Sequence, residues 1–173
     1  MQRKVSLLIA TVTLLATGLF AAAVGDTGRA SPSRSNGALV SLGRTALGKV
    51  LVDAHGRTLY LFEKDRRGMS ACSGACATYW PPLLSSAKPR PGRGVRASLL
   101  GLTRRTDGKR QVTYAGHPLY RFVSDRKAGQ ATGEGLKDFG ATWDVVGANG
   151  RGIDRDAPSP GSSGGYSGLY GSG

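Results

Sequence analysis

The chain has 173 residues, 39% of them hydrophobic, and a formal net charge of +13. With an N-terminal targeting segment set aside, at most about 150 residues remain, which is enough for one small domain with a modest core and for little more. The excess of positive charge favours an anionic partner outside the cytoplasm, and export argues against nucleic acid as that partner.

Residues 1–24 have the pattern of a secretory signal peptide. Arg3 and Lys4 precede an uncharged, mostly apolar run, and Ala21–Ala23 offers small residues for cleavage. The run is also about long enough to span a bilayer, so an uncleaved anchor is the alternative. We therefore predict an exported protein, extracellular or associated with the cell envelope. No cysteine lies near the run, so the sequence offers no lipobox cysteine for a lipid.

The rest of the chain divides by composition into five segments. A flexible tether rich in Ser, Gly, Arg and Pro is predicted over 25–44, and a disordered Gly/Ser tail over 149–173. Between them we expect repeat 1 over 45–85, a basic inter-repeat segment over 86–108 and repeat 2 over 109–148.

The two repeats are recognised from one motif that occurs twice. Residues 58–65 read Thr-Leu-Tyr-Leu-Phe-Glu-Lys-Asp, and residues 118–125 read Pro-Leu-Tyr-Arg-Phe-Val-Ser-Asp. Leu, Tyr, Phe and Asp recur at an offset of 60 positions. A repeat of this kind means that one supersecondary unit is used twice and that its copies pack together.

Each copy has the pattern of a β-hairpin. In the first, alternating Val50 and Val52 precede turn residues at 53–56 and an apolar run at 59–62. The second has the same order over 111–123, and Trp143 opens a plausible last strand. We predict a mostly β, monomeric small domain, made of two β-hairpin-based repeats packed as a pseudo-two-fold pair between flexible tails.

The motif aromatics are predicted to form the seam between the copies. Tyr60 and Phe62 have a spacing of two, as do Tyr120 and Phe122, so each pair shares one face of its strand. We expect these rings in the core, with each phenol reaching a polar partner. A platform for carbohydrate or aromatic ligands is the alternative.

Asp65 and Asp125 follow their tyrosines by five residues, an odd offset that places them on the opposite face of a regular strand. The Tyr and Asp of one copy should therefore not pair side by side, and each Asp suits a turn that its own side chain stabilises. Two such carboxylates could flank a sugar as in a glycoside hydrolase, but no other feature supports this remote alternative.

Cys72 and Cys76 are the two cysteines of the chain, in a C-x3-C spacing. In an oxidising compartment they are expected to form a structural disulfide. The spacing is a poor match to the C-x-x-C of redox sites, and a metal site would need further ligands.

His55 and His117 lie in the turns before the two motif strands, at positions that are not equivalent. With Met69 or a carboxylate they could bind a metal ion or a haem iron, which would suit a redox accessory of the envelope. Exposed turn histidines are the simpler interpretation.

Positive charge concentrates at 88–110, which holds eight cations against the single acid Asp107. This excess predicts a surface for an anionic wall polymer, a membrane surface or an envelope protein. The predominance of arginine over lysine could also reflect coding bias alone. The arginines that we expect to bind such a partner are Arg93, Arg96, Arg104, Arg105 and Arg110.

The doubled Tyr-x4-Asp motif, with its surroundings, resembles a bacterial family of secreted and lipoprotein-like tandem repeats commonly described as of unknown function. The surroundings that match include Cys72–Cys76 and Trp80-Pro-Pro, and the resemblance covers roughly 45–147. Many relatives carry a lipoprotein cysteine, which this chain lacks. The resemblance implies no catalytic residue. We therefore predict an exported, non-enzymatic envelope module without a required cofactor.

Overall fold

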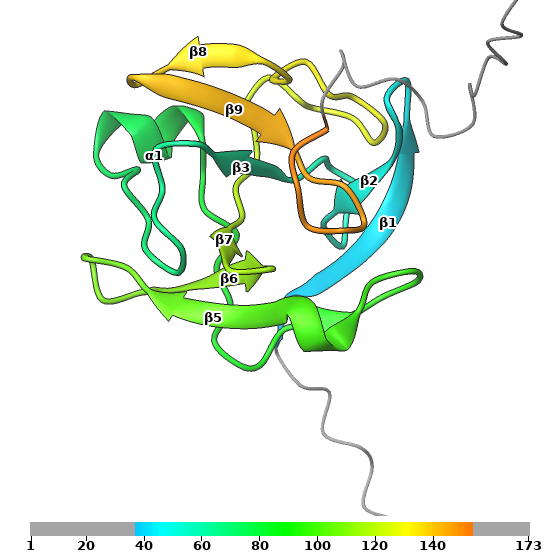
Figure 1. The fold of residues 1–173 in the computed structure, drawn as a ribbon, viewed down its shortest axis with the longest axis horizontal. Coiled ribbons are helices and arrows are strands. Elements are labelled where there is room, and N and C mark those ends of the chain that lie inside the picture. Colours follow the sequence, from blue (N-terminus) through cyan, green and yellow to red (C-terminus); the bar gives the residue numbers. More distant parts are fainter. Residues whose placement is uncertain (1–36, 154–173) are drawn as a thin grey trace, which may run out of the picture. The chain divides into compact units, whose positions relative to one another are not determined.

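The structure, a computed structural model, describes residues 37–153 (Figure 1). The predicted signal peptide at 1–24, the tether up to residue 36 and the tail from residue 154 lie outside the described residues. Within the described part the fold is mostly β, as predicted, with one short α-helix, α1 (Ala75–Tyr79), and one 3-10 turn, η1 (Ala97–Leu99).

Three small sheets of three strands each make up the described part. The first has the order β2-β1-β4, with β1 at Leu39–Thr45, β2 at Gly48–Val52 and β4 at Arg90–Pro91. The second has the order β3-β9-β8, with β3 at Tyr60–Phe62, β9 at Ala141–Val145 and β8 at Leu136–Asp138. The third has the order β5-β6-β7, with β5 at Leu100–Arg104, β6 at Arg110–Tyr114 and β7 at His117–Pro118.

The hairpins β1–β2 and β5–β6 open the two repeats and differ at their tips. A two-residue turn joins Thr45 to Gly48 in the first hairpin, whereas residues 105–109 connect Arg104 to Arg110 in the second. The predicted link from Val52 through the Asp53 turn is present as a bridge between Val52 and Thr58. The strand that follows, β3, pairs with β9 of the other repeat instead of continuing a hairpin with β2.

Three segment boundaries differ from the sequence predictions. β1 begins at Leu39, inside the segment 25–44 that composition assigned to a tether, because β2 and β4 supply backbone partners on both its sides. The basic segment 86–108 contains β4, η1 and β5, so it is folded structure and its last strand belongs to repeat 2. The predicted tail from residue 149 begins inside the described residues, and the Ile153 N–H donates to the Val145 carbonyl at 2.8 Å.

The motif strands meet at their tyrosines. The N–H of Tyr60 donates to the carbonyl of Tyr120, and the N–H of Tyr120 donates to the carbonyl of Tyr60, each at 2.9 Å. Such a reciprocal pair is the hydrogen-bonded pair of antiparallel strands. It relates the two copies by a local two-fold, which is the pseudo-symmetric packing that the repeat predicts.

Residues 59–62, which include β3, are buried on both faces of the strand, and their side chains alternate between two core clusters. Tyr60 and Phe62 enter an aromatic cluster with both tryptophans, while Leu59 and Leu61 enter an aliphatic cluster with residues of β6. All four side chains are at most 2% exposed. Burial of this extent on a three-residue strand explains why the motif is apolar on both faces.

Candidate functional site

Each motif tyrosine bonds the aspartate of the other repeat. The Tyr60 hydroxyl donates to Asp125 Oδ2 at 2.5 Å, and the Tyr120 hydroxyl donates to Asp65 Oδ2 at 2.7 Å. The odd spacing predicted that Tyr and Asp of one copy do not pair, and no bond joins them within a copy in the described residues. It did not predict that the pairs cross. Each repeat therefore supplies a tyrosine to the aspartate of the other, and we call these two Tyr–Asp hydrogen bonds the crossed pairs.

The second carboxylate oxygen of each aspartate organises its own loop. Asp65 Oδ1 accepts the Ala71 N–H at 2.7 Å, and Asp125 Oδ1 accepts the Thr132 N–H at 2.9 Å and its hydroxyl at 2.7 Å. The predicted turn role of these residues is therefore also present in the structure. One side chain fixes both the local loop and the partner repeat.

Burial sets the protonation of the crossed pairs. It raises the pKa of both Tyr60 and Tyr120 above the usual range, and the neighbouring carboxylates add to the effect, so both phenols stay neutral donors. Burial also raises the pKa of Asp65 to about 6, although the hydrogen bonds from Ala71 and Tyr120 oppose it. The Asp65 carboxyl therefore changes its charge near pH 6.

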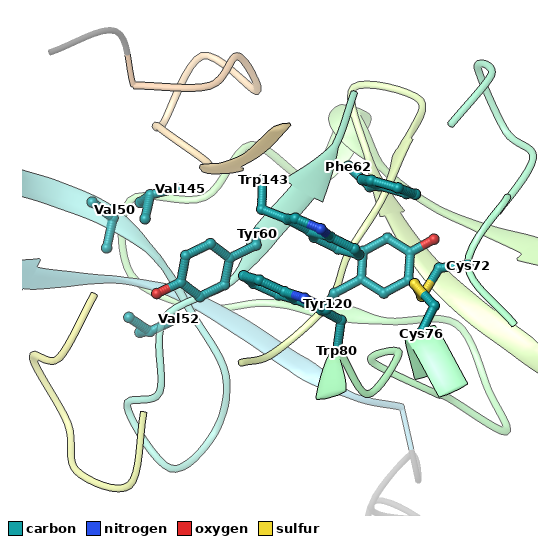
Figure 2. Packing of buried hydrophobic residues seen from close by; sticks show 10 residues of the cluster. All are labelled: Val50, Val52, Tyr60, Phe62, Cys72, Cys76, Trp80, Tyr120, Trp143 and Val145. Atoms are coloured by element: carbon teal, nitrogen blue, oxygen red, sulfur yellow. A yellow bond between two sulfur atoms is a disulfide. The ribbon is translucent and has the colours of Figure 1, made fainter. Parts of the chain in front are cut away.

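Four stacked rings fill the space between the crossed pairs. Phe62 lies on Trp143 with centroids 4.1 Å apart, Trp143 on Trp80 at 4.0 Å, and Trp80 on Phe122 at 4.3 Å. Figure 2 shows the two indoles between the phenol rings of Tyr60 and Tyr120. The rings of these tyrosines are fully buried, so they are core rather than a platform for a ligand.

The two motif carboxylates do not face a common space. The hydroxyls that bond them, on Tyr60 and Tyr120, point away from one another across the indoles (Figure 2). Asp125 is 1% exposed and has both oxygens occupied. This arrangement is unlike the pair of carboxyl groups that flanks a sugar in glycoside hydrolases.

The cysteines form the predicted disulfide, between Cys72 and Cys76, and α1 begins inside the loop that it closes. Arg105, a residue of repeat 2, holds this loop in place through hydrogen bonds. Its guanidinium donates to the Cys72 carbonyl at 2.7 Å, to Ser70 Oγ at 2.8 Å and to Gln111 Oε1 at 2.7 Å. Because Arg105 is 6% exposed and bonded in this way, it departs from the expectation that it meets a partner at the surface.

The other four arginines predicted to bind a partner, Arg93, Arg96, Arg104 and Arg110, are exposed. Arg93 lines a depression of about 370 Å³ together with Arg44 and Lys49, and no carboxylate lines it. Arg110 lines a second depression, of about 510 Å³, with Lys109, Ser85 and Ser86 among its neighbours.

The sequence prediction missed Arg44 and Lys49, which flank the β1–β2 turn. The structure brings Arg93 to them because β4 pairs in parallel with β1, and the Leu42 N–H then donates to the Arg93 carbonyl at 2.9 Å. Gly92 permits this approach, since a Cβ there would lie 1.9 Å from Ser41 Oγ. A non-local pairing of two residues has no signal in hydrophobic periodicity.

The histidines lie in different environments. His55 is exposed in the turn that Asp53 organises by accepting the His55 N–H at 2.8 Å, while His117 is partly buried in β7. Met69, which the metal hypothesis invoked, is 57% exposed. Within 37–153, no three His, Cys, Asp or Glu side chains form a group that could hold a metal ion.

Asp53 carries a further contact between repeats. Its Oδ2 accepts from Arg121 Nε at 2.7 Å, and the side chain of Asp53 is 1% exposed. Burial opposes ionisation, but N–H donors from Arg57 and His55 outweigh it and lower the pKa of Asp53. A buried, ionised carboxylate paired in this way supports the repeat interface rather than proton transfer.

Comparison with known proteins gives one finding. A family model described as a secreted repeat of unknown function matches the chain twice, over 41–84 and 101–147, which together exceed half of its length. No curated protein and no solved structure shows significant similarity to the chain. In the part of the chain that the structure describes, no helix is long and apolar enough to cross a membrane.

Proposed function

The chain belongs to a family of secreted repeats of unknown function, and from this premise we propose that it is an exported, non-enzymatic module that binds an anionic polymer of the cell envelope. The observation that carries the proposal is the depression lined by Arg44, Lys49 and Arg93 without a carboxylate. Three cations around one hollow suit a chain of phosphates or carboxylates, which arrives with several charges at once.

The second depression extends the same surface chemistry to repeat 2. Lys109 stands 60 positions after Lys49, at the corresponding end of the β5–β6 hairpin, and Arg110 lies beside it. The nearest acid in sequence, Asp107, is occupied by the Lys109 N–H and by Arg105. A long polyanion could therefore contact both repeats, which raises its avidity without a new kind of site.

Binding is favoured over catalysis because the carboxylates of the repeated motif already have structural partners. Asp65 and Asp125 each bond a phenol and their own loop. Arg44, Lys49 and Arg93 instead line an open depression, and they offer charge that a polymer can neutralise with release of its counterions.

The test uses a phosphodiester polymer such as poly(glycerol phosphate) and measures its affinity for the purified chain across a salt series. Reversing two cations of the first depression, as Arg44→Glu with Lys49→Glu, should weaken binding at least about thirtyfold, since each cation lost near an anionic surface costs about 1 kcal/mol and each glutamate adds repulsion. The salt dependence of the remaining affinity should also become shallower.

Arg66→Glu with Lys137→Glu is the matched control, because both residues are exposed, line neither depression and change the net charge equally. This variant should retain most of the affinity. If both double variants lose binding alike, the attraction is a property of net charge and the proposed site is wrong. Binding to phosphatidylglycerol vesicles but not to the polymer would identify the membrane surface as the partner instead.

A further inference from the structure

Two aromatic rings lie exposed and side by side outside the aromatic core. Tyr79, in α1, is 56% exposed, and Phe139, in the turn between β8 and β9, is 40% exposed. Their centroids are 6.1 Å apart and their planes are tilted by 39°. Exposed aromatic side chains are common singly, but an adjacent pair calls for a physical reason.

Phe139 occupies a backbone conformation that disfavours it. Asp138 pairs with Ala141, so Phe139 and Gly140 form a two-residue hairpin turn, and their φ values are +55° and +90°. A turn with positive φ at both positions selects Asn, Asp or Gly at the first of them. A bulky residue at such a position is an outlier, and strain of this kind concentrates at sites of function.

Both rings are held on braced elements. Cys76 ties α1 into the disulfide loop, and the Tyr79 carbonyl accepts the Val123 N–H at 3.1 Å. The turn is fixed by Lys64 Nζ, which donates to the Phe139 carbonyl at 3.2 Å, and by the Trp143 indole N–H, which donates to the Asp138 carbonyl at 3.3 Å. Because the backbone is fixed in this way, only the side-chain rotation of each ring is lost when a ligand binds.

The pair lies where the two repeats differ in structure. The segment that ends at Trp80 is a helix closed by a disulfide, whereas the segment that ends at Trp143 is the hairpin β8–β9. Figure 1 shows α1 beside this hairpin. Each divergent segment thus contributes one exposed ring, next to the stacked indoles that they share.

The size and rim of the pair identify the kind of ligand. One aromatic side chain buries about 150–250 Å² at most, so two rings fall well below the 1,000 Å² or so of a stable protein interface. The exposed side chains of Lys64, Lys137 and Asp138 adjoin the turn. These charged groups can form hydrogen bonds with the hydroxyls of a ligand. Acyl chains would displace water from them and offer no hydrogen bond in return.

We propose that Tyr79 and Phe139 form a binding site for a pyranose ring of a β-1,4-linked glycan. Equatorial substituents leave the faces of such a ring covered with C–H groups, which stack on aromatic faces while the hydroxyls at the edge meet Lys64 and its neighbours. The site is separate from the two basic depressions, since none of its residues lines either of them.

The experiment measures binding of the purified chain to oligomers of N-acetylglucosamine and of glucose by calorimetry, together with the melting temperature of each variant. Phe139→Asn should weaken binding about tenfold and raise the melting temperature by roughly 2–4 °C, because Asn tolerates the turn. Tyr79→Ala should weaken binding to a similar degree. Met69→Ala changes an exposed apolar side chain outside the pair and should bind as the unaltered chain does.

The opposite shifts in affinity and stability separate a ligand site from a structural role. A ring that only stabilised the fold would lower the melting temperature when replaced by Asn, and that result would overturn the proposal. The proposal would also be overturned if the unaltered chain bound none of these oligomers. It would likewise be overturned if the Phe139→Asn and Tyr79→Ala variants lost binding only to lipid vesicles. Loss of polyanion binding in Arg44→Glu with Lys49→Glu, without loss of glycan binding, would keep the two sites distinct.

Discussion

The two crossed pairs contain the same bond in different surroundings. At one end, Tyr60 donates to Asp125, which is 1% exposed and is also held by Thr132. At the other, Tyr120 donates to Asp65, which is only partly buried. The Tyr120 hydroxyl also lies 2.8 Å from Ser70 Oγ, next to the disulfide loop and the Arg105 guanidinium.

The two repeats thus keep the same hydrogen bond in both crossed pairs, while the surroundings of the two aspartates differ. The Asp125 end is closed, since its carboxylate is buried and both of its oxygens accept hydrogen bonds. The Asp65 end is more open: its carboxylate is only partly buried, burial raises its pKa to about 6, and it lies beside the loop that bears α1. The ends should therefore respond differently to mutation, to reduction and to pH.

The largest expected effect is at the closed end. Asp125→Ala removes the acceptor of the Tyr60 hydroxyl and of two Thr132 donors, all in buried or partly buried positions. We expect a loss of about 3–4 kcal/mol in the free energy of unfolding, against about 1–2 kcal/mol for Asp65→Ala, where water can replace the lost partner. Urea unfolding of both variants measures the difference, and equal losses would remove the distinction between the ends.

Reduction of the disulfide should affect the Asp65 end of the crossed pairs, which is the more open of the two. Cys72→Ser opens the loop that directly follows Ala71, whose N–H donates to Asp65. We expect a loss of about 1–2 kcal/mol and a melting temperature lower by a few degrees, since a short loop gains less from closure than a long one. Combined with Asp125→Ala, the loss should be additive. A melting temperature that does not change on reduction would show that the cysteines contribute nothing to stability.

The smallest expected effect is the pH dependence that Asp65 gives to the free energy of unfolding. Because the folded-state pKa of Asp65, about 6, exceeds its usual value of 3.8, its contribution to stability is fully present below pH 3.8 and is lost as pH rises through 6. After allowance for partial exposure, we expect unfolding to become easier by roughly 1 kcal/mol between pH 4.5 and 7.

Asp65→Asn is the control for this pH dependence, because it removes the titrating group and keeps a hydrogen-bonding side chain. Its unfolding free energy should change less than that of the unaltered chain over the same interval. Asp53 does not confound the measurement, since its pKa is lowered and its effect appears at more acidic pH. Identical pH profiles for the two proteins would contradict the assignment.

Sequence reasoning reached the local features and missed the non-local ones. The repeated motif predicted two packed β units and buried aromatics, and the spacing of Cys72 and Cys76 predicted the disulfide, because each signal lies within a few residues. The partner of each Asp depended on how strands about 60 positions apart meet, which no local pattern encodes. Composition likewise hid β1, whose pairing with β4 depends on tertiary structure.

The basic site shows the same limit. Charge counting found the cluster at 88–110 but could not separate exposed from buried cations. Arg105 turns inward, where the Cys72 carbonyl and the Gln111 side-chain oxygen accept hydrogen bonds from its guanidinium. Arg44 and Lys49 join the site only because β4 lies against β1.

The most direct test of the crossed pairs is a pair of double-mutant cycles that measure the free energy of unfolding. Tyr60→Phe combined with Asp125→Asn should show a coupling of at least about 1 kcal/mol, because the two side chains share a buried hydrogen bond. Tyr60→Phe combined with Asp65→Asn, the aspartate of its own motif, should be additive within about 0.5 kcal/mol. Coupling within the motif and additivity across the repeats would contradict the crossed arrangement.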